Sequence, residues 1–286
     1  MRRTLTGPRS GKALAAILAL GAAAGFQLRC GGQQPSAESV VETIQRRGAL
    51  KVGVSTFEPW AMRDRNGELV GFEVDVATKL AEDMGVGIEF VPTSWDGIIP
   101  ALLAGKFDVI IGGMSIRPQR NLTINFTIPY AHSGMGIAAN RDLAAHLAWP
   151  DGYDIEDVTL TCRRGASACN DAARLFPRAT IRRFDDDIQA IQEVLNGNAH
   201  AVLSSYPKPV EWAGRNPELL FLPTTGNLSQ GDEAFGLRKG DPDALNFFSN
   251  WIRVNTTNGW LAERYDYWFK TTNWLDEVRP GSTPQQ

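Results

Sequence analysis

The same alternation of apolar strand and amphipathic helix occurs twice along the chain, and this repeat constrains the fold more than any other feature. The segment GKFDVIIGG, residues 105–113, ends in an apolar strand. Moving it forward by 92 positions places it on GNAHAVLSS, residues 197–205, which ends the second copy in the same way. Strands that alternate with helices predict parallel sheets covered by helices on both faces.

The expected elements follow from hydrophobic period and from Asp and Gly at the helix ends. The first copy is expected to consist of strands 49–54, 88–93 and 107–113 and helices 71–85 and 95–106. The second copy is expected to consist of strands 158–162, 180–184 and 199–205 and helices 167–176 and 186–198. An α/β fold with two lobes follows, with a cleft between the carboxyl ends of their strands.

Two extended segments, 136–142 and 234–243, are expected to connect the lobes. Lobe 1 would then comprise residues 48–138 and 236–275, and lobe 2 residues 139–235 with the hinge segments. Two crossings form a hinge that can close over a ligand.

The C-terminal part is expected to add one aromatic-rich helix, 244–269, followed by a tail at 276–286. Four large apolar side chains on this helix are expected to pack in the core rather than contact a ligand: Phe248, Trp251, Trp260 and Trp268.

The first thirty residues have the pattern of an export signal, because a basic start precedes an apolar run at 13–26 that is too short to span a bilayer comfortably. Cys30 follows this run and precedes residues 31–47, which are expected to form a flexible tether and the start of the fold. The arrangement resembles a bacterial lipoprotein with a lipidated cysteine, although Arg29 replaces the usual small residue. Cleavage without lipidation is the alternative. Either way, we expect an exported protein in the periplasm or on the outer face of the membrane.

Cys162 and Cys169 lie seven positions apart and could pair in an oxidising compartment. A closure of this length would stabilise the fold by about 2.5 kcal/mol in the loop-entropy model. Two small buried thiols are the alternative.

Composition argues against several other classes of protein. The 286-residue chain is 43% hydrophobic, ample for a packed core, and its net charge of −3 gives no support for nucleic-acid binding. Its three histidines lack metal-ligand spacing, and neither a phosphate loop nor a nucleophile elbow is found in its required context. We therefore expect no metal and no cofactor, and a protein that acts as a monomer.

The stretch GFEVDVATKLAEDM, residues 71–84, matches a family signature position by position. Similarity continues through WDGIIPALLAGKFDVIIGGMSIRPQR, NFTIPY, RRGAS and AFGLRKGDP, so that it covers residues 48–272. The chain thus resembles the bacterial extracellular solute-binding proteins of family 3, which serve polar amino acid ABC transporters. The resemblance implies the two-lobe periplasmic-binding-protein fold, a small-molecule ligand captured by lobe closure, and an ABC permease as partner.

The resemblance also implies a site in lobe 1. Arg120 matches the residue that makes a two-pronged contact with the ligand's α-carboxylate. Ser115, with a backbone carbonyl near Gly113, matches the acceptors of the ligand's ammonium. The remaining matches are two aromatic walls around the ligand's side chain and a weaker third candidate, expected to pack under its loop: Phe57, Trp95 and Trp60.

In lobe 2, Ala166 and Ser167 match the loop whose amides meet the same carboxylate at the start of a helix. The first N–H groups of a helix have no partner within it, and the helix dipole favours an anion there. Ser167 can also be the N-cap of this helix.

One position departs from the family pattern, because Ser205 stands where an aspartate usually holds the ligand's ammonium. A buried ammonium without a carboxylate keeps its desolvation cost. Either Glu58 supplies the charge, or the ligand is a carboxylate without a free ammonium. Four cationic side chains could then add positive potential, although each by itself is expected on the solvated surface: Arg117, His132, Arg163 and Arg164.

Two other functions remain as alternatives. The same fold carries a cyclohexadienyl (arogenate/prephenate) dehydratase, and VPTSW (91–95) and FTIPY (126–130) resemble it. That enzyme needs a general acid in the cleft, where this chain has Cys169 between the non-acidic Ala168 and Asn170. A thiol is a poor substitute at its ordinary pKa. A ligand-sensing module would need a separate signalling partner.

Overall fold

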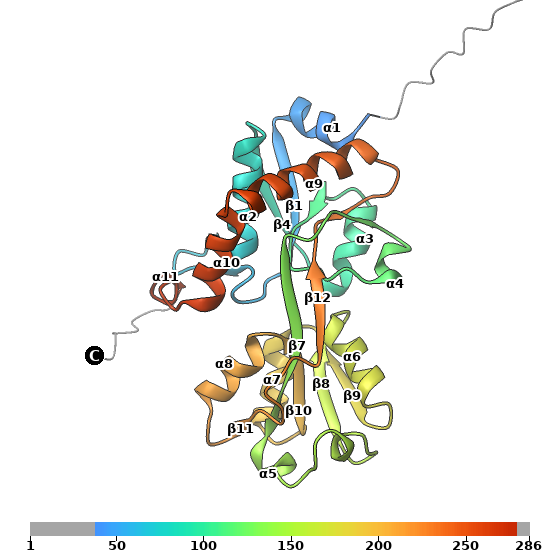
Figure 1. Ribbon diagram of the computed structural model, residues 1–286, viewed down its shortest axis with the longest axis vertical. Coiled ribbons are helices and arrows are strands. Elements are labelled where there is room, and N and C mark those ends of the chain that lie inside the picture. The colour runs from blue at the N-terminus through green and yellow to red at the C-terminus, as the bar shows by residue number, and fades with distance from the viewer. Residues whose placement is uncertain (1–37, 279–286) are drawn as a thin grey trace, which may run out of the picture. The chain divides into compact units, whose positions relative to one another are not determined.

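The structure, a computed structural model, describes residues 38–278 (Figure 1). The expected export signal with Cys30, and most of the expected tail, lie outside the described residues. Within the stretch 31–47, expected to form a tether and the start of the fold, the described residues include helix α1 (Val40–Arg47). Ser39 and Glu42 form a capping box at its start, which explains why the chain becomes helical there.

The first sheet has the strand order β4-β1-β5-β13-β6. Its strands are β1 (Ala49–Val54), β4 (Gly87–Pro92), β5 (Val109–Ile110), β6 (Asn125–Phe126) and β13 (Gly236–Leu237). Strand β1 pairs in parallel with both β4 and β5, whereas β13 runs antiparallel to β5 and β6. The strand β5 is shorter than the expected 107–113, because the chain turns at Gly112 and Gly113 into the loop that lines the site.

Helices cover this sheet on two sides with separate apolar clusters. One cluster joins alternate residues of β1, such as Leu50 and Val52, to helices α1, α2 (Phe72–Asp83), α9 (Pro242–Thr257) and α10 (Trp260–Lys270). The other cluster packs η1 (Trp95–Gly97) and α3 (Ile98–Leu103) against Ile110. Alternate side chains of a strand face opposite sides of the sheet, so a strand buried on both faces is apolar throughout.

The second sheet has the order β11-β7-β10-β8-β9, and β12 also pairs with β7. Its strands are β7 (Ala131–Asn140), β8 (Thr159–Arg163), β9 (Thr180–Phe184), β10 (Ala201–Ser205), β11 (Leu220–Phe221) and β12 (Ser229–Glu233). Apolar side chains join α6 (Ser167–Leu175) to one face, and α7 (Asp187–Leu195) and α8 (Lys208–Arg215) to the other.

The two sheets repeat one plan. In each, the first parallel strand of a β-α-β-α-β unit lies between the second and the third, in the orders β4-β1-β5 and β9-β8-β10. An antiparallel strand follows on the far side of the third strand, β13 in one sheet and β7 in the other. The two-lobe α/β fold expected from the repeat is confirmed.

Strands β7 and β12 pair with each other and carry the chain between the lobes. Strand β7 pairs with β12 at residues 131–135 and with β10 at residues 135–139, and its Ala131 packs in the lobe 1 core whereas its Met135 packs in the lobe 2 core. The first crossing therefore lies within β7, between Ala131 and Met135, a few residues before the boundary predicted at 138. The second crossing lies within β12, where Ser229 pairs with Met135 and Glu233 pairs with Ala131, and the lobe boundaries at 138 and 235 stay predictions.

The expected single helix at 244–269 is wrong, since two helices, α9 and α10, occupy this stretch. The break is at Asn258 and Gly259, where Gly259 has a φ of 84° that most side chains disfavour. The packing expectation holds, because Phe248, Trp251 and Trp268 are buried in the lobe 1 core and Trp260 packs against it.

Short elements complete the described chain: β2 (Met62–Arg63), β3 (Leu69–Val70), α4 (Pro118–Asn121), α5 (Arg141–Ala144), η2 (Asp151–Tyr153) and α11 (Leu275–Val278). Between residues 38 and 278, no helix has the length and apolar character needed to cross a membrane.

Candidate ligand-binding site

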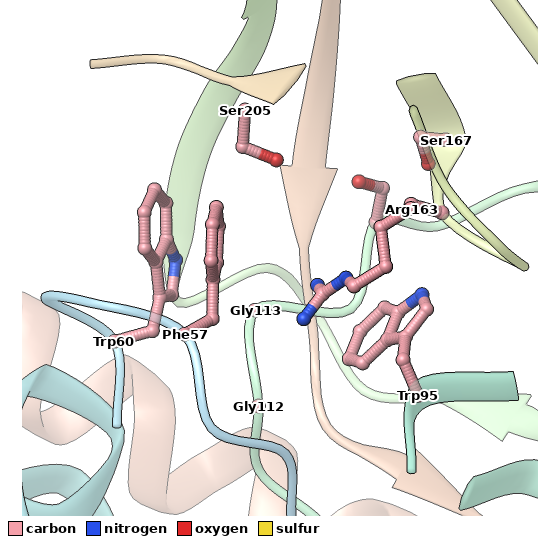
Figure 2. A pocket seen from close by; sticks show the side chains of 10 residues that line it. Phe57, Trp60, Trp95, Gly112, Gly113, Arg163, Ser167 and Ser205 are labelled. Atoms are coloured by element: carbon pink, nitrogen blue, oxygen red, sulfur yellow. The ribbon is translucent and has the colours of Figure 1, made fainter. Parts of the chain in front are cut away.

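A small cavity of about 20 Å³ lies between the loops of the two lobes (Figure 2). A volume of this size holds about one water molecule. Its lining combines aromatic rings, small residues, hydroxyls and one guanidinium: Phe57, Trp60, Trp95, Gly112, Gly113, Ser115, Arg163, Ala166, Ser167 and Ser205.

The lining residues come from the carboxyl ends of the parallel strands. Phe57 and Trp60 follow β1, Trp95 follows β4, and residues 112–115 follow β5. In lobe 2, Arg163 ends β8, Ala166 and Ser167 follow it at the start of α6, and Ser205 ends β10. Ligands of open α/β sheets bind at these strand ends, where the strand order reverses. The topology therefore brings most of the expected site residues to one place.

A guanidinium fills the space between the expected aromatic walls. The Cζ atom of Arg163 lies 4.6 Å from the ring centroid of Phe57 and 4.8 Å from that of Trp95. Figure 2 shows the Arg163 side chain reaching from lobe 2 toward these rings and Gly113. Both separations are within the range of a cation–π contact. Arg163 is only 6% exposed, so the expectation that it lies on the solvated surface is wrong.

Arg163 has a buried partner on the lobe 2 side. Its Nε lies 3.0 Å from Oδ2 of Asp187, the first residue of α7, in an ion pair without hydrogen-bond geometry. The other carboxylate oxygen of Asp187 accepts a hydrogen bond from Ser204 at 2.7 Å. Burial lowers the pKa of Arg163, and the Asp187 carboxylate opposes this effect.

A disulfide joins Cys162 to Cys169 and closes the loop that carries Arg163 and Ser167. Cys162 lies in β8 and Cys169 in the first turns of α6, so the bond ties the strand end to the helix start. The loop residues between them therefore have few alternative positions.

Ser167 is the first residue of α6 and not its N-cap, which is Ala166. The Ser167 hydroxyl instead accepts a hydrogen bond from Nε of Arg117, in lobe 1, at 2.7 Å. The same guanidinium forms an ion pair with Asp171 of α6 at 3.0 Å. Arg117 thus connects the two lobes, in contrast to the expectation that it lies on the solvated surface. Arg164 and His132 are exposed and pair with Asp185 and Asp232, respectively.

Arg120 does not line the small cavity but lies in an adjoining hollow of about 360 Å³ that Trp95 also lines, with its Cζ atom 5.7 Å from the Trp95 ring centroid. Its two terminal nitrogens donate to the carbonyl oxygens of Ser115 and Gly165, each at 2.9 Å, so it also connects the lobes. Burial and the nearby Arg117 and Arg163 lower the pKa of Arg120 to about 10, and the guanidinium remains charged at neutral pH.

Buried carboxyl groups support the lobe 1 side of the cavity. The Gly113 amide donates to the hydroxyl of Tyr130, which donates to Glu73 at 2.6 Å. Trp60 donates from its indole nitrogen to Glu233 at 3.3 Å. Burial raises the pKa of Glu73 well above its ordinary value, and Glu233 raises it further. Gly113 has a φ of 65°, and a Cβ there would come within 2.6 Å of the Trp60 ring.

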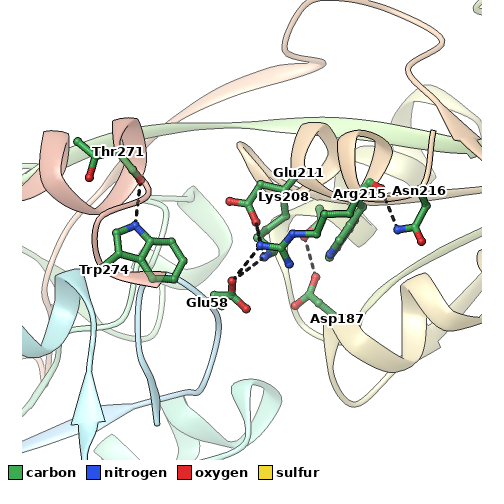
Figure 3. A network of polar contacts seen from close by, with 10 residues as sticks. Glu58, Asp187, Lys208, Glu211, Arg215, Asn216, Thr271 and Trp274 are labelled. Carbon is green, nitrogen blue, oxygen red and sulfur yellow. Dashed lines mark hydrogen bonds and ion pairs between the residues drawn. The ribbon is translucent and has the colours of Figure 1, made fainter. Parts of the chain in front are cut away.

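Glu58 does not reach the cavity. Its carboxylate faces α8, with Lys208 at 3.9 Å and Arg215 at 3.4 Å (Figure 3). These two cations from lobe 2 hold the carboxylate at the side of the loop, which explains why it does not stand in for the missing aspartate. Ser205 does line the cavity, where its hydroxyl lies 3.9 Å from the sulfur of Met135.

Sequence reasoning missed the place of Arg163 between the rings. The available signal was its position as the last residue of β8, because that strand end faces the cleft. Trp60 lines the cavity and stacks on Phe57 with ring centroids 4.6 Å apart, so the packing expected for it and a place in the lining coexist. Among residues 38–278, no cluster of His, Cys, Asp and Glu could hold a metal ion.

Comparison with known proteins identifies the family of this chain. The sequence model of the bacterial extracellular solute-binding proteins, family 3, matches residues 50–271. An octopine-binding periplasmic protein of Rhizobium meliloti is 40% identical over 73% of this chain and 76% of its own length. A cyclohexadienyl dehydratase of Pseudomonas aeruginosa is 25% identical over 89% of this chain and 92% of its own length.

Solved structures with the same fold include binding proteins. A putative ABC transporter binding component of Wolinella succinogenes, solved in complex with lysine, is 36% identical with a TM-score of 0.74, over 80% of this chain and 99% of that one. An ancestral amino acid-binding protein, described as a precursor of cyclohexadienyl dehydratase, is 35% identical with the same TM-score, over 81% of this chain and 100% of that one. The chain is therefore a member of family 3 of the bacterial extracellular solute-binding proteins.

Proposed function

We propose that this chain captures a small amino-acid-like carboxylate between its lobes and delivers it to an ABC permease. The observation that carries this proposal is a cavity enclosed by strand-end loops of both lobes. Its lining offers hydroxyls, the amides at the start of α6, aromatic rings and a guanidinium, which together suit a small polar solute with an apolar portion. The family and the relatives named above support the transport role.

Capture requires the lobes to separate, since a space of about 20 Å³ is too small for an amino acid. Opening breaks the bonds of Arg120 and Arg117 to lobe 2. The Arg120 guanidinium, released from Gly165, can then bind the solute's carboxylate with two parallel hydrogen bonds. Closure adds the hydroxyl of Ser167 and the α6 amides. The solute favours closure because only the closed form makes both sets of contacts.

A thermal-shift screen of amino acids, keto acids and dicarboxylates tests the proposal. A solute that binds only the folded protein raises the melting temperature in proportion to the logarithm of its concentration. We expect at least one small carboxylate to do so, with one site per chain by calorimetry. A complete absence of stabilisation by the carboxylates of the screen would contradict the proposal.

The dehydratase relative makes enzyme activity a second candidate, and the site favours binding alone. Dehydration of prephenate needs a proton donor in the cleft. The residues that line the cavity include no carboxyl, histidine or thiol, and Cys169 is held in the disulfide. Incubation of the purified protein with prephenate is therefore expected to yield no phenylpyruvate above the uncatalysed rate. Rapid formation of phenylpyruvate would establish the enzyme instead.

We further propose that the chain is exported and anchored through a lipidated Cys30. The apolar run before this residue and the polar stretch after it support the assignment. Fractionation of cells that express the full chain tests it, because Cys30→Ser should move the protein from the membrane fraction to the soluble fraction. An unchanged distribution between the fractions would mean that Cys30 does not anchor the protein, and export without lipidation would be the remaining interpretation.

A further inference from the structure

We infer that the site selects an acidic solute, one with a second anionic group in addition to the carboxylate that Arg120 binds. This inference rests on the proposed function and names the ligand class of the same site. The structural basis is the Arg163 guanidinium, which occupies the slot between Phe57 and Trp95 where the ligand's side chain is expected.

Arg163 is held in place by its surroundings. Its side chain is almost fully buried, and it starts from the end of β8 inside the loop closed by the disulfide. The Asp187 ion pair fixes its Nε from the lobe 2 side. A side chain anchored at this depth contributes a charge to the site and not to the surface.

The Arg163 guanidinium has donors to offer to a ligand. Within residues 38–278, its two terminal nitrogens make no hydrogen bond to the protein, and its ion pair with Asp187 lacks hydrogen-bond geometry. A guanidinium presents five N–H donors in a planar fork that matches a carboxylate. An anionic group of the solute next to this fork would satisfy donors that the protein leaves without acceptors.

Asp187 offsets part of the Arg163 charge, but Arg120 is a second cation close enough for Arg163 to lower its pKa, and the remaining carboxyl groups nearby are engaged elsewhere. No carboxylate belongs to the lining, and Ser205 stands where relatives are expected to have an aspartate. Asp171 and Glu58 already face the cations Arg117 and Arg215. Glu233 lies behind the Trp60 indole, and burial raises its pKa. The side chain of a bound lysine or arginine would therefore meet Arg163 as a like charge in a poorly solvated slot.

The ligand class that fits is a small dicarboxylate. A free amine is not required, because the position expected to bind it carries a hydroxyl. Acidic amino acids and plain dicarboxylic acids share this chemistry, and they are distinguished by comparing L-glutamate with glutarate.

Titration calorimetry with glutarate, L-glutamate, L-glutamine and L-lysine tests the inference. We expect glutarate or L-glutamate to bind the unmodified protein at least about tenfold more tightly than L-glutamine, and L-lysine not to bind measurably. Equal or tighter binding of L-glutamine or L-lysine would overturn the inference.

A paired substitution identifies the residue responsible. Arg163→Gln combined with Asp187→Asn removes the guanidinium without leaving a buried carboxylate unpaired, and it is expected to weaken binding of the preferred acid at least about tenfold. Arg183→Gln is the matched control, because it removes one positive charge from the exposed surface of the same lobe. Melting curves confirm that both variants fold. Unchanged affinity of the folded double variant would overturn the inference.

The failures of the two proposals are distinguishable. If none of these carboxylates binds and no carboxylate of the thermal-shift screen stabilises the protein, the proposed function fails. If they bind without preference for a second anionic group, only the inference fails.

Discussion

The two halves of the site are held by different means. On the lobe 1 side, Gly113 is positioned by hydrogen bonds through Tyr130 to the buried Glu73, and the rings of Phe57 and Trp60 stack beside it. On the lobe 2 side, the loop that carries Arg163 is held by a disulfide and by an ion pair to Asp187. Lobe 1 therefore provides a shaped aromatic surface together with Arg120, whereas lobe 2 provides a second charge that is fixed in place.

This difference assigns separate tasks to the two lobes. Aromatic rings and small residues accept many solutes of similar shape, because apolar contacts discriminate weakly. A buried charge discriminates strongly, since an unsuitable partner leaves it desolvated without compensation. We therefore expect changes in lobe 1 to alter affinity for all solutes, and changes in lobe 2 to alter which solutes bind.

The largest expected effect concerns the cation of lobe 1 that is expected to bind every solute. Arg120→Ala should weaken binding of all carboxylates by at least about tenfold, because two charge-assisted hydrogen bonds are lost. Calorimetric titration of the best solute of the screen measures the change. Arg120→Lys should bind carboxylates with an affinity between those of the unmodified protein and the alanine variant, since lysine keeps the charge but lacks the planar fork of donors. Binding unaffected by the alanine substitution would refute the assignment of Arg120.

The next effect concerns the covalent support of the lobe 2 loop. Replacing both Cys162 and Cys169 by Ser should lower the free energy of unfolding by about 2.5 kcal/mol, as the loop-entropy model gives for so short a closure. Urea denaturation measures this loss. The same variant should lose discrimination among solutes, because Arg163 gains alternative positions. A destabilised variant with unchanged discrimination would show that the ion pair alone positions Arg163.

The support of the lobe 1 loop differs from that of the lobe 2 loop because its contribution to stability depends on pH. Because the pKa of Glu73 is raised in the folded protein, its stabilising contribution is complete below the ordinary pKa of glutamate and is lost as pH rises through the raised value. Glu73→Gln removes this titration while keeping an oxygen for the Tyr130 hydroxyl. The stability of the unmodified protein relative to this variant should therefore fall as pH rises above about 4.5. Thermal melts across pH measure the difference, and a flat or rising difference would contradict the account.

The smallest effect is expected for a substitution of Ser205, the residue that departs from the family pattern. Ser205→Asp should improve binding of solutes with an ammonium and weaken binding of plain acids, because it adds a negative charge at the edge of the cavity. Side-by-side titrations of L-glutamate and glutarate measure the shift in their ratio. A shift toward glutarate would mean that the ammonium does not lie near this position.

Much of the fold followed from the sequence, because hydrophobic period and end signals are local. The repeated strand and helix units appear as expected, and β9 occupies the expected residues. The break between α9 and α10 was missed although Asn258 and Gly259 form a turn signal, since the aromatic residues on both sides gave one continuous helical pattern. The extent of β7 was missed because its pairing partners β10 and β12 lie far along the chain.

The site was predictable where it depends on strand ends, and less so where it depends on side-chain orientation. Phe57, Trp95, Ser115, Ser167 and Ser205, which the family resemblance singled out, line one cavity, and their roles in ligand binding stay predictions. The partners of Glu58 and Arg163 could not be predicted, because Lys208, Arg215 and Asp187 belong to helices of lobe 2 distant in sequence. Such pairings depend on tertiary contacts that a local pattern does not specify.

Hydrogen exchange at the two loops tests the central claim that one solute is held by both lobes. With the tightest acid of the screen at saturation, we predict that amide exchange slows both at residues 112–116 of lobe 1 and at residues 164–169 of lobe 2. Protection confined to one loop, or absent from both while the acid is bound, would contradict capture between the lobes.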